Sequence, residues 1–166
     1  MDKIIRDATV ADLMRVNEIY NEYIVGRHTS FDEEPWTITE RQRWFTKYND
    51  QERRYRVLAL ESGGRVVGFA SSSRFKDKAA YSSSAETTVV LGGESVGRGL
   101  GGLLLGKLID ELTAAPVHRA YALIALPNEP SVALHHRHDY RDVGVLDEVG
   151  YQLDRYHSVL MMERSF

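Results

Sequence analysis

The stretch Glu94-Ser95-Val96-Gly97-Arg98-Gly99-Leu100-Gly101-Gly102 is the most informative part of the sequence, because it is expected to join a strand to a helix. The β-branched run 87–91, Thr-Thr-Val-Val-Leu, precedes it and is typical of a buried strand. Leucines at positions 100, 103, 104, 108 and 112 follow at helical spacing. Strand, glycine turn and helix together direct backbone N–H groups and the positive end of a helix dipole at one anion, and glycines admit its close approach. The stretch therefore predicts a phosphate-binding turn.

Three known motifs share this glycine pattern. Gly97-x-Gly99-x-x-Gly102 matches the dinucleotide fingerprint, but residues 117–123 lack the acidic residue that this motif places about 20 positions later. The segment 101–107 approaches a P-loop, but Leu108 stands where Ser or Thr must reach magnesium. The third pattern, Gly-x-Gly-x-Gly at the head of an amphipathic helix, resembles the pyrophosphate loop of the GNAT acetyltransferases. A turn and helix start without any ligand remains the alternative.

Length and composition limit the classes of protein. A chain of 166 residues has room for one full core and is short for two, so we expect a single domain over 1–166. A net charge of −3 gives no reason to expect nucleic acid. The N-terminus is too charged for a secretory signal, and no apolar run approaches membrane-spanning length, so no membrane partner is expected. The sequence has no cysteine, which excludes disulfides and cysteine nucleophiles and fits a cytoplasmic location.

The order of predicted elements is β-αα-ββ-β-α-β-α-β-β. It predicts an α/β (α+β) fold with a mixed, mostly antiparallel sheet of about seven strands and about four helices on both faces, unlike a Rossmann domain. Thr39 and Gln42 form a capping-box pattern for the second helix. Ser62-Gly63-Gly64 signals a hairpin, and Gly150 is expected to mark the turn between the last two strands. Strands are expected at 3–8, 55–61, 65–70, 85–91, 120–126, 140–146 and 151–162, and the last helix at 131–138.

This element order is that of the GNAT fold, and the local motifs resemble its phosphinothricin N-acetyltransferase branch, which also acetylates methionine sulfoximine and methionine sulfone. The matching residues run nearly end to end: Ile5-Arg6-x-Ala8-Thr9, Ile19-Tyr20-Asn21, Ser30-Phe31-Asp32-x-Glu34-Pro35, Gly68-Phe69-Ala70-Ser71, Ala85-Glu86, Asn128-x-x-Ser131-x-x-Leu134-His135 and Val149-Gly150-Tyr151.

The chain also departs from this family pattern. Val96 stands where the family usually has Arg or Gln, and Val90 where the branch commonly has Tyr. Asp139 replaces a glycine, and Asp tolerates the left-handed conformation at a helix end better than most residues. The changes that bear on the acceptor are Lys76 and Lys78 in place of arginines, and Gln152, Tyr156 and Ser158 in place of Lys, Trp and Asp.

The resemblance implies a catalytic role for two residues. Glu86 matches the general base, whose pKa partial burial would raise, and a solvated glutamate at a strand end is the alternative. His135 matches the tyrosine that many GNAT enzymes use to protonate the leaving thiolate, and the alternative is that it packs beside CoA or orients Asn128. His136 and His138 form a weak metal pattern with it, so no metal is expected.

The resemblance also implies two sets of binding residues. Backbone groups of Val89 and Leu91 should pair with the pantetheine arm of acetyl-CoA, and an amide of this segment should polarise the thioester carbonyl. The predicted cofactor residues are Thr88, Val89, Val90, Leu91, Val96, Gly97, Arg98, Gly99, Leu100, Gly101, Gly102, Asn128 and Ser131. The predicted acceptor residues are Phe31 and Tyr81 as apolar walls, Glu34, and Arg74, Lys76 and Lys78 as partners of a carboxylate or phosphinate, with a solvated basic face as the alternative.

The sequence thus predicts an acetyl-CoA-dependent N-acetyltransferase that acts by direct attack in a ternary complex on the α-amine of a small amino-acid analogue, such as phosphinothricin, methionine sulfoximine or methionine sulfone. A homodimer is expected from the resemblance alone. Polyamines, aminoglycosides or a protein N-terminus are alternative acceptors, because Asp32, Glu33 and Glu34 make the acceptor loop acidic. A non-catalytic acyl-CoA-binding domain is the alternative from a different class.

Overall fold

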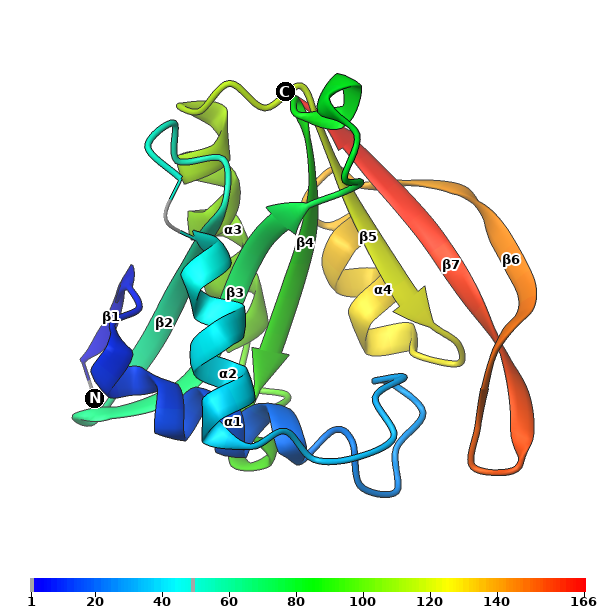
Figure 1. Cartoon of the computed structure of the whole chain (residues 1–166), viewed down its shortest axis with the longest axis horizontal. Helices are drawn as coiled ribbons and strands as arrows, with labels where there is room; N and C mark the ends of the chain where they lie inside the picture. Colours follow the sequence, from blue (N-terminus) through cyan, green and yellow to red (C-terminus); the bar gives the residue numbers. More distant parts are fainter. Residues whose placement is uncertain (1, 49) are drawn as a thin grey trace.

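The computed structural model describes residues 2–48 and 50–166. This part of the chain contains one seven-stranded sheet with strand order β1-β2-β3-β4-β5-β7-β6 (Figure 1). Neighbouring strands are antiparallel, with the exception of β4 and β5, which pair in parallel. The strands are β1 (Lys3–Asp7), β2 (Arg56–Ser62), β3 (Arg65–Arg74), β4 (Ser84–Leu91), β5 (Arg119–Ala125), β6 (Arg141–Gln152) and β7 (Arg155–Ser165). Within the same residues the α-helices are α1 (Leu13–Asn21), α2 (Ile38–Phe45), α3 (Leu100–Thr113) and α4 (Glu129–His136).

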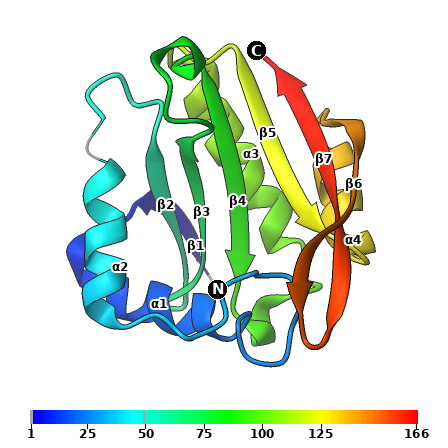
Figure 2. The same cartoon turned by 45° about the vertical axis from the view of Figure 1, so that its right-hand side comes forward.

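This architecture confirms the predicted α/β (α+β) fold, a mixed and mostly antiparallel sheet flanked by helices. The helices α1 and α2 cover one face of the sheet, and α3 and α4 cover the other (Figures 1 and 2). Side chains alternate along a strand, so Leu58 and Leu60 of β2 pack against α3, whereas Val57 and Ala59 pack against α1 and α2. α4 shares the face of α3.

Two predicted boundaries were wrong for identifiable reasons. The capping box of α2 is formed by Thr37 and Glu40, because the Thr37 hydroxyl accepts from the Glu40 N–H while the Glu40 carboxylate accepts from the Thr37 N–H at 2.7 Å. The last hairpin turns at Leu153 and Asp154, which both adopt positive φ as in a two-residue type I′ turn. Gly150, predicted to mark this turn, lies inside β6.

The parallel pairing of β4 and β5 is short, and it creates the opening that the site uses. It ends at Glu86 and Tyr121, after which the two strands diverge, as Figures 1 and 2 show. The Thr87 hydroxyl donates to the Tyr121 carbonyl at 3.2 Å, and the buried Tyr140 hydroxyl lies 2.7 Å from the Thr87 oxygen. Burial raises the pKa of Tyr140 to about 12, so this hydroxyl keeps its proton at neutral pH. These side chains close the floor of the opening.

The described helices are all too short or too polar to cross a membrane.

Candidate active site

A cleft of about 530 Å³ lies where β4 and β5 diverge. It is lined by residues 87–91 of β4, residues 122–125 of β5, the glycine turn, and the start and inner face of α4. Of the predicted cofactor residues, Arg98 does not line the cleft and is exposed to solvent. The others line the cleft: Thr88, Val89, Val90, Leu91, Val96, Gly97, Gly99, Leu100, Gly101, Gly102, Asn128 and Ser131. The structure therefore brings these sequence-distant segments together as one surface.

The glycine turn has the geometry of an anion cradle. Gly97 and Gly99 have φ values of 78° and 74°, a left-handed conformation that side chains rarely adopt, and a Cβ added at either would meet no described atom within 4 Å. Gly99 is the N-cap of α3, and the first bond of the helix ladder runs from the Leu103 N–H to the Gly99 carbonyl. The N–H groups of Leu100 and Gly101 precede that bond, so they are available to an anion at the positive end of the helix.

Other predicted cofactor residues also have structural tasks. The Asn128 side-chain oxygen caps α4 by accepting from the Ser131 N–H at 3.3 Å, which leaves its amide N–H groups for the cleft. The Leu91 carbonyl accepts a hydrogen bond from the Tyr23 hydroxyl at 2.6 Å. Gly101 lets α3 approach α4, because an added Cβ would lie 3.4 Å from a Leu134 methyl group. These contacts fix the cleft walls before any ligand enters.

His135 faces this cleft from α4 and is 4% exposed. Its Nδ1 lies 2.8 Å from the Ser131 carbonyl, so Nδ1 must carry the proton and donate. In the neutral ring Nε2 is then an acceptor, and Nε2 is buried with no hydrogen-bond partner among the described residues. Burial lowers the pKa of His135, and the neighbouring His138 and His136 act in the same direction. The geometry favours a neutral acceptor over a proton donor at neutral pH.

Glu86 lies at the last position where β4 pairs with β5, beside Ser73 of β3 and Tyr121 of β5. Its side chain shares a face with Val90, which packs under α1 and α2, whereas Thr87 and His135 lie on the α3 and α4 face. The predicted base and the predicted acid are therefore on opposite faces of the sheet. Burial raises the pKa of Glu86, while the positive charge of Lys76 partly opposes that rise. A raised pKa makes a carboxylate a better proton acceptor.

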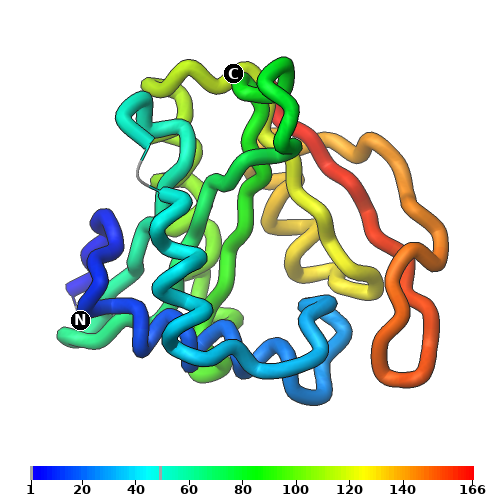
Figure 3. The backbone as a smooth tube through the Cα atoms, viewed as in Figure 1, coloured from blue at the N-terminus to red at the C-terminus, as the bar shows by residue number. Residues whose placement is uncertain are grey.

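The predicted acceptor residues do not form one small pocket. Phe31 and Glu34 belong to the α1–α2 loop, residues 22–37, whereas Lys78 and Tyr81 belong to the segment 75–83 between β3 and β4. Figure 3 shows these two segments at opposite ends of the sheet. The nearest aromatic partner of Tyr81 is Phe75, at 6.2 Å between ring centroids, whereas Phe31 lies 6.3 Å from His157.

Contacts with β5 confirm that separation. The α1–α2 loop meets the C-terminal end of β5, where His28 Nε2 lies 3.0 Å from the Pro127 carbonyl. The segment 75–83 meets the N-terminal end, where the His118 N–H donates to the Ser83 carbonyl at 2.7 Å. A strand of seven residues spans about 20 Å. Phe31 and Tyr81, both predicted as apolar walls of the acceptor site, therefore belong to segments that meet opposite ends of β5, and their contact with an acceptor stays a prediction.

The basic acceptor residues also separate. Lys76 is the one whose charge acts on Glu86. Arg74 instead donates to the Asp77 carbonyl at 3.3 Å and lies over the Tyr55 ring. Lys78 is exposed at the start of a short 3-10 turn. The structure thus brings Lys76, and not the whole basic run, to the predicted base.

Sequence reasoning missed several residues of the site. Tyr121 lies opposite Glu86 and stacks on Phe75 with 4.3 Å between ring centroids, which makes an aromatic wall beside the carboxyl group. Arg137 lines the cleft from the end of α4, and Thr29 lines it from the α1–α2 loop, which was predicted to contact the acceptor and not the cofactor. Strand pairing and loop closure bring these residues in, and neither leaves a short-range pattern in the sequence. Within residues 2–48 and 50–166 no group of three or more His, Asp or Glu side chains is arranged to hold a metal.

Comparisons with known proteins identify the family. The family model for the acetyltransferase (GNAT) domain matches residues 5–161. The phosphinothricin N-acetyltransferase of Streptomyces coelicolor is 40% identical over 161 residues, which cover 96% of this chain and 94% of the relative. The L-methionine sulfoximine/L-methionine sulfone acetyltransferase of Pseudomonas aeruginosa is 31% identical, with 98% of this chain and 94% of the relative covered.

Two solved structures share the fold over nearly the whole chain. The ribosomal-protein-alanine N-acetyltransferase of Brucella melitensis has a TM-score of 0.93 and 31% identity, covering 98% of this chain and 99% of that one. A phosphinothricin acetyltransferase of Sinorhizobium meliloti, solved in complex with acetyl-CoA, has a TM-score of 0.94 and 28% identity, covering 100% of this chain and 89% of that one. The chain belongs to the GNAT acetyltransferase family.

Proposed function

We propose that the enzyme transfers an acetyl group from acetyl-CoA to the α-amine of a small amino-acid analogue, such as phosphinothricin, methionine sulfoximine or methionine sulfone. The observation that carries this proposal is the position of Glu86 in the last pair between β4 and β5, directly before residues 87–91 that line the cleft. A half-buried carboxyl group with a raised pKa lies on one face, and a cleft with an anion cradle opens next to it in the sequence of β4. The names of the relatives support the acceptor class.

The cleft residues fit acetyl-CoA. The N–H groups at the start of α3 and the open space at Gly97 and Gly99 suit a pyrophosphate. The backbone of 88–91 has no strand partner on its β5 side beyond the last pair at Glu86, so it is available to the amide groups of the pantetheine arm. Asn128 has side-chain N–H groups to offer from the start of α4. When bound, acetyl-CoA supplies the activated acetyl group.

The chemistry is a direct transfer in a ternary complex. Glu86 accepts a proton from the acceptor ammonium, and the neutral amine forms a C–N bond with the thioester carbonyl carbon while a backbone N–H near Val89 stabilises the oxyanion. The C–S bond then breaks, the nitrogen of the new amide releases its second proton, and the thiolate of CoA takes up a proton. His135 is the predicted donor in its protonated form, and its lowered pKa limits that form at neutral pH. In the neutral form its Nε2 instead accepts a hydrogen bond from the bound thiol or amide.

The acceptor lies on the face that carries Glu86. Tyr121 and Phe75 form its apolar wall, and Lys76 faces its carboxylate or phosphinate. The other predicted acceptor residues approach from two sides. Arg74, Lys78 and Tyr81 come from the end of β3 and the segment after it, and Phe31 and Glu34 come from the α1–α2 loop. A polyamine, an aminoglycoside or a protein N-terminus remains the alternative acceptor, which the acidic run at positions 32–34 favours.

We also propose that the chain works as one domain in a cytoplasmic homodimer.

The test is the release of CoA thiol from acetyl-CoA with a panel of acceptors. We expect saturable turnover with phosphinothricin, methionine sulfoximine and methionine sulfone, and little with a polyamine or an aminoglycoside. Glu86→Gln should lower kcat/KM about a hundredfold or more, because it removes the base. Glu18→Gln is the matched control, since Glu18 is exposed on α1 beside Arg15. Turnover with the polycations alone, or a Glu86→Gln enzyme as active as the control, contradicts the proposal. Binding of acetyl-CoA without any turnover would favour the non-catalytic alternative.

A further inference from the structure

Two buried polar atoms line the cofactor cleft without a hydrogen-bond partner among the described residues. They are the hydroxyl oxygen of Thr29 and Nε2 of His135. Buried polar atoms in folded proteins nearly always have a partner, because leaving one unpaired costs free energy. Two such atoms facing one cleft indicate that a ligand with hydrogen-bonding groups completes them.

Thr29 reaches the cleft on a different element from the other lining residues. It belongs to the α1–α2 loop (residues 22–37), whereas His135 belongs to α4. The loop connects the two helices on one face of the sheet, and α4 lies on the other face. Ser30 lines the cleft beside Thr29. The loop therefore forms an outer wall of the cleft, and Thr29 is the residue whose hydroxyl it buries there.

The hairpin of β6 and β7 holds this loop in place. The Phe31 ring lies directly on Gly150, so closely that a Cβ added at Gly150 would be 2.6 Å from the ring atom Cζ. The Gln152 side chain donates to the Asp32 carbonyl at 3.0 Å. Close packing at Gly150 is thus possible because glycine has no side chain.

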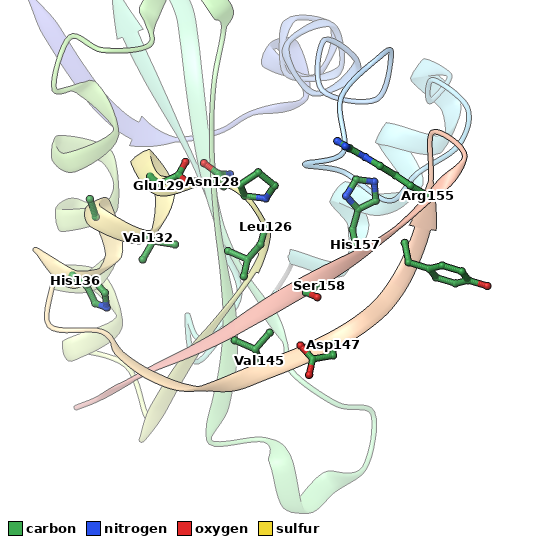
Figure 4. Close-up of a pocket in the computed structure, with 13 residues that line it drawn as sticks. Leu126, Asn128, Glu129, Val132, His136, Val145, Asp147, Arg155, His157 and Ser158 are labelled. Atoms are coloured by element: carbon green, nitrogen blue, oxygen red, sulfur yellow. The ribbon is translucent and has the colours of Figure 1, made fainter.

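Two histidines add a third contact between loop and hairpin. The His28 ring stacks on the His157 ring with 5.0 Å between centroids and an interplanar angle of 6°. His28 also bonds the Pro127 carbonyl, and His157 the Gln152 carbonyl, each at 3.0 Å. Figure 4 shows His157 on β7 and Asn128 at the start of α4 on opposite walls of the neighbouring groove. His28 therefore ties the loop both to the hairpin and to the turn that begins α4.

We propose that the Thr29 hydroxyl hydrogen-bonds the pantetheine arm of acyl-CoA, and that Gly150 is a positioning residue that lets the hairpin hold Thr29 over the cleft. A hydroxyl both donates and accepts, so either an amide N–H or an amide carbonyl of that arm satisfies it. The proposal rests on the proposed use of this cleft for acetyl-CoA. It assigns to the loop a cofactor contact in addition to its place beside the acceptor.

The first test measures acetyl-CoA binding to the purified full chain by isothermal titration calorimetry, which needs no turnover. Thr29→Val keeps the shape of the side chain and removes the hydroxyl, so its dissociation constant should rise about tenfold, the value of one hydrogen bond. Thr29→Ser keeps the hydroxyl and should bind within about twofold of the wild type. Thr39→Val, at an exposed position of α2, is the control. Equal binding by Thr29→Val and wild type, or equal weakening in Thr29→Val and Thr29→Ser, would overturn the proposal.

The second test addresses the hairpin. Gly150→Ala should weaken acetyl-CoA binding, because the Phe31 ring must move and carry the loop with it; the ring is 42% exposed, so the fold itself can adjust. Gly144→Ala is a matched control in the same strand, where an added Cβ meets no described atom within 4 Å. In a Gly150→Ala/Thr29→Val double variant the losses should be less than additive, because both remove the same contact. Fully additive losses, or a Gly150→Ala protein that binds like Gly144→Ala, contradict the positioning role.

The two levels of the proposal fail in different ways. A wild-type protein that does not bind acetyl-CoA would overturn the proposed function of the cleft. A wild-type protein that binds acetyl-CoA, with Thr29→Val binding equally well, would overturn the role of Thr29 alone.

Discussion

At the scale of single residues, the acid–base chemistry depends on one carboxyl group that burial and a neighbouring cation push in opposite directions. Burial raises the pKa of Glu86, and the charge of Lys76 lowers it. A base works only when ionised, so the rate should be lost as the pH falls through the raised pKa of Glu86. Removing the positive charge should then raise this pKa further.

Lys76→Met is therefore expected to move the acid limb of the kcat profile to higher pH. The measurement is kcat from pH 5 to 9 at saturating acetyl-CoA and acceptor. Lys3→Met, at an exposed position of β1, is the control and should leave the limb in place. A limb that stays fixed in Lys76→Met would mean that Lys76 does not act on the base, and a limb that moves to lower pH would contradict the sign of the argument.

At the scale of elements, the joint between β4 and α3 depends on glycines at positions where the backbone is left-handed. Gly99→Ala should cost about 1–2 kcal/mol of stability, because an L-residue is strained at a φ of 74°. Gly64→Ala is a matched control, since Gly64 has a φ of 76° in the β2–β3 turn and an added Cβ there also meets no described atom within 4 Å. The two variants should unfold at similar denaturant concentrations.

Only Gly99→Ala should weaken acetyl-CoA binding, because its Cβ enters the space that the cradle leaves open for an anion. Calorimetric titration of the two variants measures this difference at matched stability. Equal affinities in Gly99→Ala and Gly64→Ala would contradict a role for the turn in binding.

The same elements show what a sequence can and cannot predict. The strand, the glycine turn and the start of α3 were predictable because local chemistry dictates them: β-branched residues at 87–91, glycines at positive φ, leucines at helical spacing. The turn at Leu153 and Asp154 was missed because leucine carries no turn signal, although the cross-strand register places it there. Tyr121 was missed, and Thr29 was expected beside the acceptor and not in the cofactor cleft, because pairing and packing between distant segments bring both to their places. The Nδ1 bond that sets the tautomer of His135 likewise depends on the folded helix.

At the scale of the whole molecule, β6 leaves one edge of the sheet open. It is twelve residues long, and Gln152, at its end, is its one buried residue. Apolar side chains on it are 43% to 57% exposed: Val143, Val145, Leu146, Val149 and Tyr151. A groove of about 760 Å³ runs beside it, lined by Val145 and Val132 among others (Figure 4). Long apolar edge strands promote association unless a partner covers them, and a second copy of the chain is the partner that we propose.

A charge placed on this strand is therefore expected to separate the subunits. Val149 is 57% exposed, so Val149→Glu costs the monomer little, but it would bury an unpaired carboxylate in an interface that covers β6. Light scattering coupled to gel filtration should give the mass of a dimer for the wild type and of a monomer for Val149→Glu. Val10→Glu adds the same charge at a position that is 66% exposed on the short turn before α1, and it should remain dimeric. A monomeric wild type would refute the homodimer, whereas a dimeric Val149→Glu would show that the interface lies on a face other than β6.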